Sequence, residues 1–329
     1  MNMPGILAAF HGLKALVIGD ICLDRWCSYD PASSEPSRET GIPRLGVVST
    51  EVTPGGGGTV ANNLAALGAG QVEVIGIRGD DGFGFELRQA LAARGICADR
   101  MVKIQDWQTF TYTKLLNSST EEEDQPRVDF ISTRPLPTDA EQEVIENILW
   151  AVPLFDVILV ADQAETSAGG VITPAVRDLL IHLAEKYPQK IFLADSRKRL
   201  HFFRKVVLKP NRDEAEAASQ SLFGRVDFSA LRRHLEAKVL IVTHGPKGAL
   251  ITWDRGEAWA ETRPVEKPID ICGAGDSFAA ACALTLAATG DPVAAARLGN
   301  LAASVTIMKR GTGTASPEEI LAAEEGQSA

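Results

Sequence analysis

The sequence is poor in several features that mark whole classes of protein, and each absence narrows the range of functions. Its 329 residues include five cysteines, with no Cys-x-x-Cys pair, no disulfide framework and no Cys/His spacing of a zinc site. The first residues contain no basic segment and no clear cleavage site, and no apolar run is long enough to span a membrane. We therefore expect a cytoplasmic protein without a membrane partner.

A surplus of basic residues is also absent. Lys and Arg number 33 against 43 Asp and Glu, which gives a formal net charge of −10 at pH 7. Because proteins hold nucleic-acid backbones mainly through an excess of Lys and Arg, we expect no nucleic-acid partner. An acidic protein can still bind a phosphate group at a local site. The sequence has no P-loop motif Gly-x-x-x-x-Gly-Lys-Ser/Thr, so such a site must be built in another way.

Apolar runs of strand length alternate with helical patterns along most of the chain. Continuous apolar runs are typical of buried parallel strands, and amphipathic stretches between them are typical of the helices that cover such a sheet. The predicted strands lie at 15–19, 72–77, 157–160, 190–194, 206–208 and 239–243. The predicted helices lie at 60–67, 84–94, 139–151, 173–186 and 277–289. The alternation predicts one α/β domain over residues 1–329, with a doubly wound, mostly parallel sheet.

Two segments interrupt this alternation, at about 25–53 and 107–133. The first is polar and turn-rich before a short alternating run, and the second has β-prone residues on both sides of an acidic turn at Glu121–Asp124. We predict two antiparallel hairpins that form one small β-sheet, a lid beside the α/β core. A pair of surface hairpins without such a role is the alternative. An exposed small sheet could also join two copies of the chain into a homodimer.

The most informative segment is Asp270-Ile-Cys-Gly-Ala-Gly-Asp276, which precedes a run of small residues with good helical propensity. Gly273, Ala274 and Gly275 would then stand at a helix N-terminus, where unpaired backbone N–H groups and the helix dipole favour an anion. Asp276 would lie beside that anion and could accept the proton of a hydroxyl that attacks a phosphoryl group. A plain helix cap would use the same residues, so the segment alone leaves both interpretations open.

Four successive glycines, Gly55–Gly58, precede the first predicted helix. They indicate a sharp bend, a flexible turn or the close approach of a ligand. The stretch Gly56–Ala61 also matches the dinucleotide fingerprint Gly-x-Gly-x-x-Ala, with Asp80 about 20 residues further on, which is typical of nicotinamide-dependent oxidoreductases. However, this fingerprint should close the first strand of a βαβ unit, and the first strong strand ends at Gly19 instead.

Other polar residues and turn glycines follow predicted strands, at the edge where open α/β sheets bind ligands. They are Asp20, Asp24, Asn211, Glu214, Thr243, Gly245 and Gly248. Carboxylates at such an edge can pair with sugar hydroxyls or a metal. Each position also has a structural alternative: a turn or cap for Asp24, a helix N-cap for Asn211, and a simple hairpin after Thr243.

Together and in this order, these segments resemble the ribokinase (PfkB-type) carbohydrate kinase family over nearly the whole chain. The stretch Asp270–Asp276 matches the family's specific Asp-x-x-Gly-Ala-Gly-Asp signature. Weaker family signatures recur at the glycine pair near residue 55 and at 79–84, 211–214 and 243–248. The spacing is most similar to the heptose-phosphate kinases of bacterial lipopolysaccharide synthesis. That likeness rests on Gly19-Asp20 with Asp24, Thr113-Lys114, Arg127-Val-Asp129, and the run from Gly55 to Gly68.

The sequence departs from the heptose-kinase pattern at four places. Thr59 and Cys272 replace the usual Asn and Thr, Asp162-Gln-Ala-Glu165 lacks the lysine of Asp-Tyr-x-Lys-Gly, and Asp195-Ser-Arg197 replaces Asp-Pro-Lys. Asp276 and its glycines are intact. The resemblance therefore implies that kinase chemistry is kept, whereas the identity of the acceptor is open.

The resemblance implies ATP and Mg²⁺ as cofactors and a sugar or sugar phosphate as acceptor, with a heptose phosphate as the best candidate. Asp276 would accept the hydroxyl proton, and the backbone amides of Gly273, Ala274 and Gly275 would stabilise the transferred phosphoryl group. The nucleotide would lie near Asn211, Glu214, Thr243, Gly245, Gly248 and Asn300, with Glu214 also near the metal. The sugar would be held by Asp20, Asp24, Gly55, Gly56 and Asn63. Lys114 and Arg127 could meet a second phosphate on the acceptor, although Arg127 could instead form a cross-strand ion pair with Asp129.

Three other functions remain open at this stage. A nucleoside or other small-alcohol kinase of the same fold would differ only in its acceptor. An oxidoreductase that uses Gly56–Ala61 would bind a nicotinamide cofactor and would gain no thermal stability from MgATP. A catalytically silent regulator would bind ligands without forming ADP.

Overall fold

An eight-stranded sheet forms the centre of the computed structural model, which describes residues 2–164, 169–262 and 265–326. Its strand order is β14-β13-β12-β11-β10-β9-β1-β4. The strands from β12 to β4 are parallel, and β13 is antiparallel to both of its neighbours, β12 and β14. The strands are β1 (Lys14–Gly19), β4 (Gln71–Ile75), β9 (Val157–Asp162), β10 (Ile191–Ser196), β11 (Val207–Leu208), β12 (Val239–Thr243), β13 (Ala249–Trp253) and β14 (Gly256–Ala260). The predicted doubly wound, mostly parallel α/β fold is confirmed.

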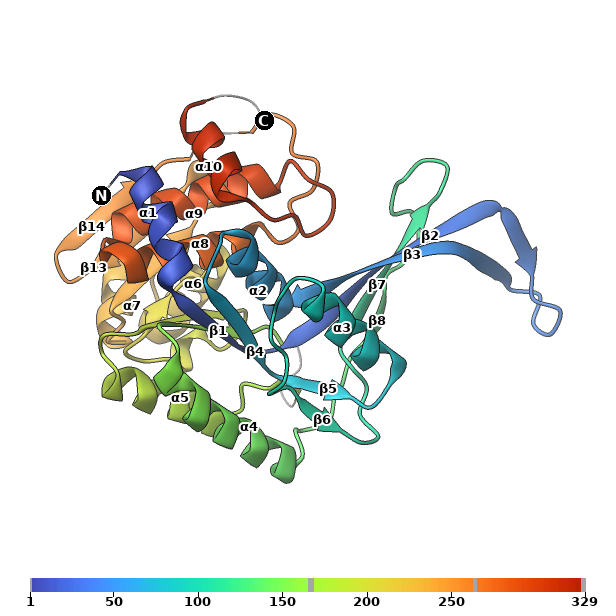
Figure 1. Cartoon of the computed structure of the whole chain (residues 1–329), viewed down its shortest axis with the longest axis horizontal. Helices are drawn as coiled ribbons and strands as arrows, with labels where there is room; N and C mark the ends of the chain where they lie inside the picture. The colour runs from blue at the N-terminus through green and yellow to red at the C-terminus, as the bar shows by residue number, and fades with distance from the viewer. Residues whose placement is uncertain (1, 165–168, 263–264, 327–329) are drawn as a thin grey trace.

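Helices cover both faces of this sheet because its strands are apolar on both sides (Figure 1). Within β1, Val17 joins the core on one face and Leu16 joins the core on the other. The first core includes residues of α1 (Met3–Ala9), α2 (Gly57–Ala66), α3 (Gly82–Ala92), α8 (Ala274–Thr289), α9 (Pro292–Thr306) and α10 (Pro317–Glu324). The second includes residues of α4 (Thr138–Ala151), α5 (Pro174–Lys186), α6 (Arg212–Phe223) and α7 (Phe228–His234). None of the helices in the described residues is long and apolar enough to cross a membrane.

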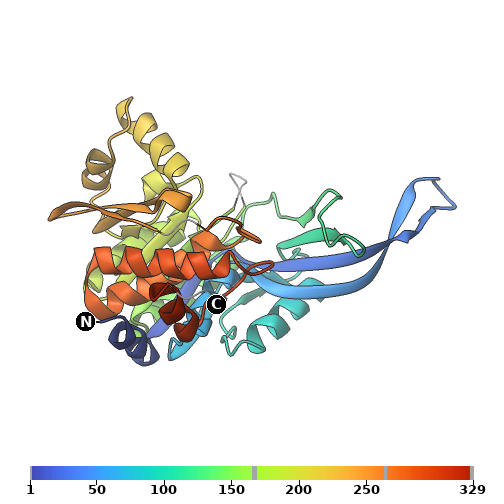
Figure 2. The same cartoon turned by 90° about the horizontal axis from the view of Figure 1, so that it is seen from above.

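A second, four-stranded sheet leaves this body as a long ribbon (Figure 2). Its order is β3-β2-β7-β8, from strands β2 (Ile21–Pro36), β3 (Pro43–Gly56), β7 (Thr111–Asn117) and β8 (Val128–Phe130). The two predicted antiparallel hairpins are present, and a parallel pairing of β2 with β7 joins them. The first hairpin is longer than expected because β2 begins two residues after β1 ends and β3 runs directly into α2. We call this element the small sheet.

The strand predicted at 72–77 is confirmed over 72–75 but ends earlier than predicted, because the chain bends at Gly76. β4 ends before this glycine, and β5 (Ile77–Gly79) pairs instead with β6 (Val102–Ile104) in a separate two-stranded sheet. A Cβ at Gly76 would lie 2.7 Å from the carbonyl oxygen of Gly19 and 2.8 Å from the side chain of Ile21. The bend therefore lets the chain pass close to the end of β1.

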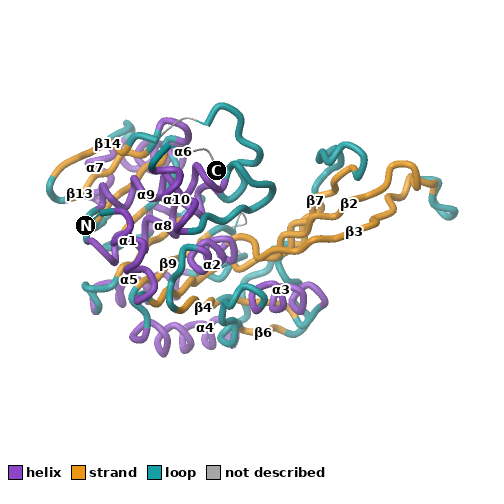
Figure 3. The backbone as a smooth tube through the Cα atoms, turned by 45° about the horizontal axis from the view of Figure 1, so that its top comes forward, coloured by secondary structure: helices purple, strands orange, loops and turns teal. Residues whose placement is uncertain are grey.

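The carboxyl ends of β1, β9 and β10 lie at one edge of the central sheet, and the small sheet leaves the body there because β2 begins two residues after β1 ends. Figure 3 shows the orange strands of β2, β3 and β7 extending away from the body. The chain passes from β1 into β2 at Asp20, so the small sheet is anchored at this edge. The N-termini of α2 and α8 meet at the same place, where a Cβ on Gly273 would lie 3.2 Å from Thr59. The fold thus brings the predicted segments to one edge of the central sheet.

Candidate active site

A small pocket of about 140 Å³ lies between the small sheet and the N-terminus of α8. Several residues predicted for the site line it: Asp24, Gly56, Lys114, Arg127, Gly273 and Asp276. Trp26, Tyr112, Gln163, Arg197 and Thr312 also line it, although the sequence analysis assigned them no role. The pocket therefore joins groups from the small sheet to groups from the carboxyl ends of the core strands.

The first turn of α8 presents free backbone donors to this pocket. Gly273 precedes the helix with a φ of 78°, a conformation that favours glycine and turns the chain into the helix. The N–H groups of Asp276 and Ser277 both donate to the carbonyl of Gly273, at 3.0 and 2.9 Å. Among the described residues, no acceptor meets the N–H groups of Gly273 or Gly275, whereas the N–H of Ala274, also predicted as a free donor, donates to the carbonyl of Ile271 at 3.3 Å. Free donors at a helix N-terminus are suited to an anion.

Asp276 stands in the first turn of α8 with its carboxylate in the pocket. Burial and then the negative charge of Asp195 raise the pKa of Asp276 to about 7, although Lys209 and Arg197 oppose the shift. The amide of Gln163 donates weakly to its Oδ1, at 3.4 Å. A carboxylate whose pKa lies near neutrality is suited to accept a proton during a reaction.

A buried lysine that the sequence analysis left without a role lies next to Asp276. Lys209 follows β11 with 3% of its surface exposed, and its Nζ lies 2.8 Å from Oδ2 of Asp195 at the end of β10. Burial alone would lower the pKa of Lys209, but the charge and hydrogen bond of Asp195 outweigh it and the pKa is raised. The position of Lys209 directly after a core strand was a usable signal, whereas its pairing with Asp195 was not visible in the sequence.

Asp24 lies on β2 opposite the glycine run. Burial raises the pKa of Asp24 to about 6, against the opposing charges of Lys114 and Arg127. A Cβ on Gly55 would collide with the Asp24 carboxylate, so glycine there makes room for this side chain. Trp26 comes two residues later on the same strand and therefore faces the same side of the sheet, which is the signal that could have identified it.

Asp20 has a different environment from Asp24. Its Oδ2 accepts the backbone N–H groups of Gln163 and Ala164, and its Oδ1 accepts that of Val171, each at 2.8 Å. Burial raises the pKa of Asp20 to about 6 despite these hydrogen bonds. With three backbone donors and 2% of its surface exposed, Asp20 ties the chain after β9 to the end of β1. Glu165, named above as a departure from the family pattern, lies outside the described residues.

The two cations predicted to meet a second phosphate differ in their contacts. Arg127 donates from Nε and Nη2 to the two carboxylate oxygens of Asp129, each at 2.7 Å, so the alternative ion pair is present. It joins residues two positions apart along the chain, however, and not the two strands, since Asp129 of β8 pairs with Tyr112 of β7. The Nζ of Lys114 lies 4.2 Å from the centre of the Trp26 ring and 3.8 Å from Glu123. Lys114 is therefore held in the pocket by a ring and by one long ion pair.

Asn63 and Asn300 are buried. Asn63 donates to the carbonyl of Thr59 one turn earlier in α2, and its Oδ1 has no hydrogen-bond partner among the described residues. Asn300 donates to the carbonyls of Ala260 and Glu261, at 3.0 and 3.2 Å, and so joins α9 to the end of β14. Neither side chain lines the small pocket.

Asn211 and Glu214 form the N-terminal cap of α6, as the structural alternative expected. Oδ1 of Asn211 accepts the N–H of Glu214, and Oε2 of Glu214 accepts the N–H of Asn211. The other carboxylate oxygen of Glu214 meets no hydrogen-bond donor in the described residues. Burial raises the pKa of Glu214, and the negative charge of Asp195 adds to the shift.

These carboxylates fit a magnesium ion that is held mainly by phosphates. No three Asp, Glu, His or Cys residues of the described ranges form a metal-binding group. Mg²⁺ typically takes only one or two protein carboxylates together with substrate phosphates and water. Glu214, whose second carboxylate oxygen meets no donor among the described residues, offers one such ligand at the edge of the sheet.

The turn after β12 is explained by its own packing. Gly245 begins a short 3₁₀ turn, and a Cβ on Gly248 would collide with the carbonyl of Ala260 on β14. The hydroxyl of Thr243 donates to the carbonyl of Pro210 at 3.4 Å, which places this strand end beside the start of α6. The predicted hairpin is thus present between β12 and β13.

The glycine run forms the junction between β3 and α2, where the backbone passes close to neighbouring atoms. A Cβ on Gly56 would lie 2.6 Å from the carbonyl of Asp20, and one on Gly58 would lie 2.6 Å from Pro54. The run follows β3, a strand of the small sheet that is antiparallel to β2, rather than a strand of the parallel sheet. The βαβ context of a dinucleotide fingerprint is therefore missing at Gly56–Ala61.

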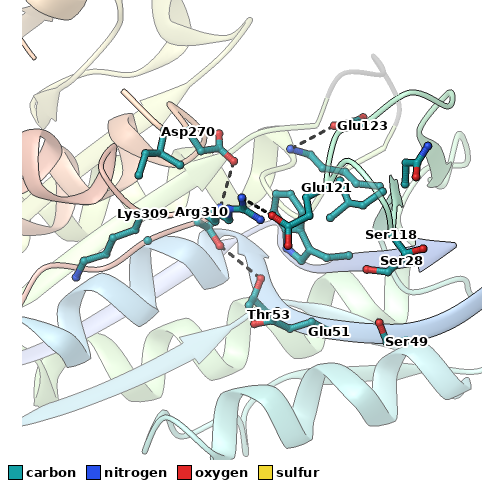
Figure 4. A pocket seen from close by; sticks show the side chains of 18 of the residues that line it. Ser28, Ser49, Glu51, Thr53, Ser118, Glu121, Glu123, Asp270, Lys309 and Arg310 are labelled. Atoms are coloured by element: carbon teal, nitrogen blue, oxygen red, sulfur yellow. Dashed lines mark hydrogen bonds and ion pairs between the residues drawn. The ribbon is translucent and has the colours of Figure 1, made fainter. Parts of the chain in front are cut away.

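A larger cleft of about 960 Å³ continues from the small pocket along the same face of the small sheet (Figure 4). Trp26, Lys114 and Thr312 line both spaces. The far wall is the segment 309–314, which touches the small sheet through Arg310–Glu121 at 2.6 Å and Thr53–Thr312 at 3.4 Å. Hydroxyl and charged groups dominate this cleft, including those of Ser28, Ser49, Ser118, Glu51 and Lys309.

The chain matches the model of the pfkB family carbohydrate kinases over residues 14–146 and 183–319. It is similar to the bifunctional protein HldE of Rhodopseudomonas palustris (strain BisB18), with 29% identity over 99% of this chain and 68% of the relative. The HldE proteins of Pelobacter propionicus and Geobacter sulfurreducens are each 32% identical, over 98% and 97% of this chain and 66% and 64% of the relative. The chain thus spans about two thirds of the length of these relatives.

Solved structures show the same fold. The ribokinase of Thermotoga maritima superposes with a TM-score of 0.70 and 21% identity, over 95% of this chain and 99% of the other. The phosphofructokinase-2 of Escherichia coli, in complex with potassium, gives a TM-score of 0.69 and 19% identity, over 94% and 97%. The expected ribokinase-like fold is confirmed.

Proposed function

Since the chain belongs to the pfkB family of carbohydrate kinases, which are phosphotransferases that use ATP and a sugar hydroxyl, we propose that it phosphorylates a sugar or sugar phosphate, with a heptose phosphate as the best candidate. The observation that carries this proposal is the position of Asp276. Its carboxylate lies beside free backbone donors in a pocket that the small sheet covers. The similarity to HldE proteins supports the acceptor, although the departures at Thr59, Arg197 and Cys272 leave room for a related sugar phosphate.

The reaction needs few groups from the protein. Asp276 accepts the proton of the acceptor hydroxyl as the hydroxyl oxygen forms its bond to the γ-phosphorus of ATP. The bond from that phosphorus to the β,γ-bridging oxygen breaks, and ADP leaves. The free N–H groups of Gly273 and Gly275 donate to oxygens of the transferred group.

Asp24 and Trp26 are the groups best suited to the sugar. The Asp24 carboxylate can accept hydrogen bonds from sugar hydroxyls, and the indole of Trp26 offers an apolar face to the ring. Lys114 suits a phosphate on the acceptor better than Arg127, because Asp129 already occupies two donors of Arg127. The hydroxyl-rich cleft beyond Trp26 leaves space for an acceptor longer than a simple pentose or hexose.

The nucleotide would lie beside the carboxyl ends of β11 and β12, between the start of α6 and the first turn of α8. Thr243 and the turn with Gly245 and Gly248 would form one side of this position, and Asn211, beside Thr243, would form another. Mg²⁺ would neutralise charge on the phosphates, with the free oxygen of Glu214 as the protein ligand nearest to them. Asp20, Asn63 and Asn300 would support the site by holding the backbone around it rather than by touching ligands.

The small sheet would act as a lid and as the contact between two copies of the chain. As a lid, it would exclude water from the phosphoryl group during transfer. The outer half of the β2–β3 ribbon is exposed, including the large apolar side chains of Ile42, Val47 and Val48. This exposure supports a homodimer in which the ribbon of one copy packs against the other.

The test is ADP release from MgATP over a panel of heptose phosphates, hexose phosphates, free sugars and nucleosides. Asp276→Asn should fold and bind MgATP while its kcat falls by about 10²–10⁴-fold, the usual contribution of a general base. Asp139→Asn is the matched control, because Asp139 also stands in the first turn of a helix, on the far face of the sheet. Unchanged turnover in Asp276→Asn would refute the assignment. Release of ADP with nucleosides alone would favour the alternative acceptor class.

A further inference from the structure

Packing alone does not explain why the charged side chain of Lys209 is buried. Its side chain is almost fully buried, and its ammonium lies where a Cβ on Gly275 would be only 3.7 Å away. The charge therefore stands directly against the first turn of α8. A buried charge costs free energy unless it is paired, and an apolar side chain of the same length would fill this space at lower cost.

The orientation of α8 makes the position of this charge more unusual. The N-terminus of a helix carries a partial positive charge, so a cation beside it is unfavourable and an anion is favourable. Asp195 pairs with Lys209 from the end of β10 and offsets part of this cost. Asp195 accepts no hydrogen bond from the N–H groups of Gly273 or Gly275 among the described residues. The ammonium therefore lies beside the first turn of α8, whose free N–H groups at Gly273 and Gly275 suit an anion.

We infer that Lys209 is a catalytic residue of the kinase reaction, whose ammonium binds the phosphoryl group during transfer, and that Asp195 is its positioning residue. An ammonium has three N–H donors, of which Asp195 takes one. The others donate to non-bridging oxygens of the phosphoryl group while its bond to the β,γ-bridging oxygen breaks. Lys209 keeps its own proton throughout, and the proton of the acceptor hydroxyl goes to Asp276. This inference rests on the kinase activity proposed above but not on the identity of the acceptor.

A purely structural role is the competing explanation. In that case Lys209 only balances the negative charges of Asp195 and Asp276, and the enzyme tolerates its loss once the charge of Asp195 is removed too. The double variant Lys209→Met/Asp195→Asn separates the two explanations. It removes both members of the pair, leaves no unpaired charge at either position, and keeps the volume nearly constant.

The experiment compares Lys209→Met, Asp195→Asn and the double variant with the wild type. Lys190→Met is the control, because Lys190 is a partly buried lysine beside β10 whose Nζ donates to backbone carbonyls at the opposite end of the strand. Three quantities are measured: kcat by ADP release, the dissociation constants of ADP and of adenylyl imidodiphosphate by calorimetry, and the melting temperature. The ATP analogue carries the terminal phosphoryl group and ADP lacks it, so their comparison needs no acceptor.

We expect kcat to be lower by about 10²–10³-fold in Lys209→Met and in the double variant. Removal of one group that stabilises the charge of a transition state usually has an effect of this size. The affinity for adenylyl imidodiphosphate should fall about tenfold or more while that for ADP changes less than about twofold. Asp195→Asn should lower kcat by a smaller factor, and Lys190→Met should change neither quantity.

Two results would overturn the inference. One is a folded double variant that regains the kcat lost in Lys209→Met, which would make the pair structural. The other is an equal loss of affinity for ADP and for its longer analogue, which would put Lys209 away from the transferred group. A wild type that phosphorylates no acceptor would instead count against the proposed function, and the two affinities would still decide the role of Lys209.

Discussion

The environment of Asp276 leads to a direct prediction of how the reaction rate depends on pH. Its pKa is raised to about 7 by burial and by the neighbouring charge of Asp195, and the residue works as a base only when ionised. We therefore expect kcat/KM to rise with pH in a single step with a midpoint near 7, and to level off above it. Initial rates between pH 5.5 and 9 at saturating MgATP measure this. A profile that stays flat between pH 6 and 8 would contradict the assigned role.

The residues of the site differ in how far the sequence could predict them. Asp276 and Gly273–Gly275 were predictable because the whole motif is contiguous and folds as one helix start. Lys209 was not assigned a role because its meaning depends on Asp195, which comes from another strand. Asp20 and Asn300 were predicted as ligand groups, yet both carry backbone hydrogen bonds that only the folded chain reveals.

Among the elements, the core strands were easier to predict than the small sheet. Buried parallel strands have continuous apolar runs, and β1, β9, β10 and β12 were found on that basis. The ribbon of β2 and β3 was harder, because its polar residues and prolines are tolerated at exposed edges and bulges. The parallel pairing of β2 with β7 joins segments about 90 residues apart, and no local sequence pattern predicts such a pairing.

The contact between the small sheet and the segment 309–314 leads to a prediction about closure. Arg310 and Glu121 form an ion pair at 2.6 Å with both side chains largely exposed, so its contribution to stability should be at most about 1 kcal/mol. Glu121→Gln should therefore leave the melting temperature nearly unchanged. Because the pair joins the lid to the core, we expect a KM for the acceptor that is several-fold higher and a faster hydrolysis of ATP without acceptor.

The control for this lid variant is Lys103→Ala, which removes another exposed ion pair at 3.0 Å, that with Asp80, away from the cleft. It should alter neither the KM of the acceptor nor ATP hydrolysis. Equal effects of the two variants would show that the Arg310–Glu121 contact has no part in closure.

At the scale of the whole molecule, the β2–β3 ribbon is the feature that a single copy of the chain leaves unexplained. A two-stranded ribbon without a third layer is only marginally stable in water. Among the described residues, β2 beyond Tyr29 pairs with β3 alone, and Val47 and Val48 of β3 have 47% and 63% of their surfaces exposed. A second copy would cover these apolar side chains and would hold both lids in place. The mass in solution should then be twice the 35.2 kDa of one chain.

Val47→Glu tests this arrangement, because it puts a charge into the proposed contact while Val47 lines neither the small pocket nor the larger cleft. We expect the variant to dissociate toward the single-chain mass at low micromolar concentration, measured by light scattering after size-exclusion chromatography. Leu149→Glu on α4 is the control, since Leu149 is an equally apolar side chain, 48% exposed, at a distance from the ribbon. It should keep the mass of the wild type. If the wild type itself has the single-chain mass at tens of micromolar, the ribbon must be stabilised within one copy, and the proposed dimer is wrong.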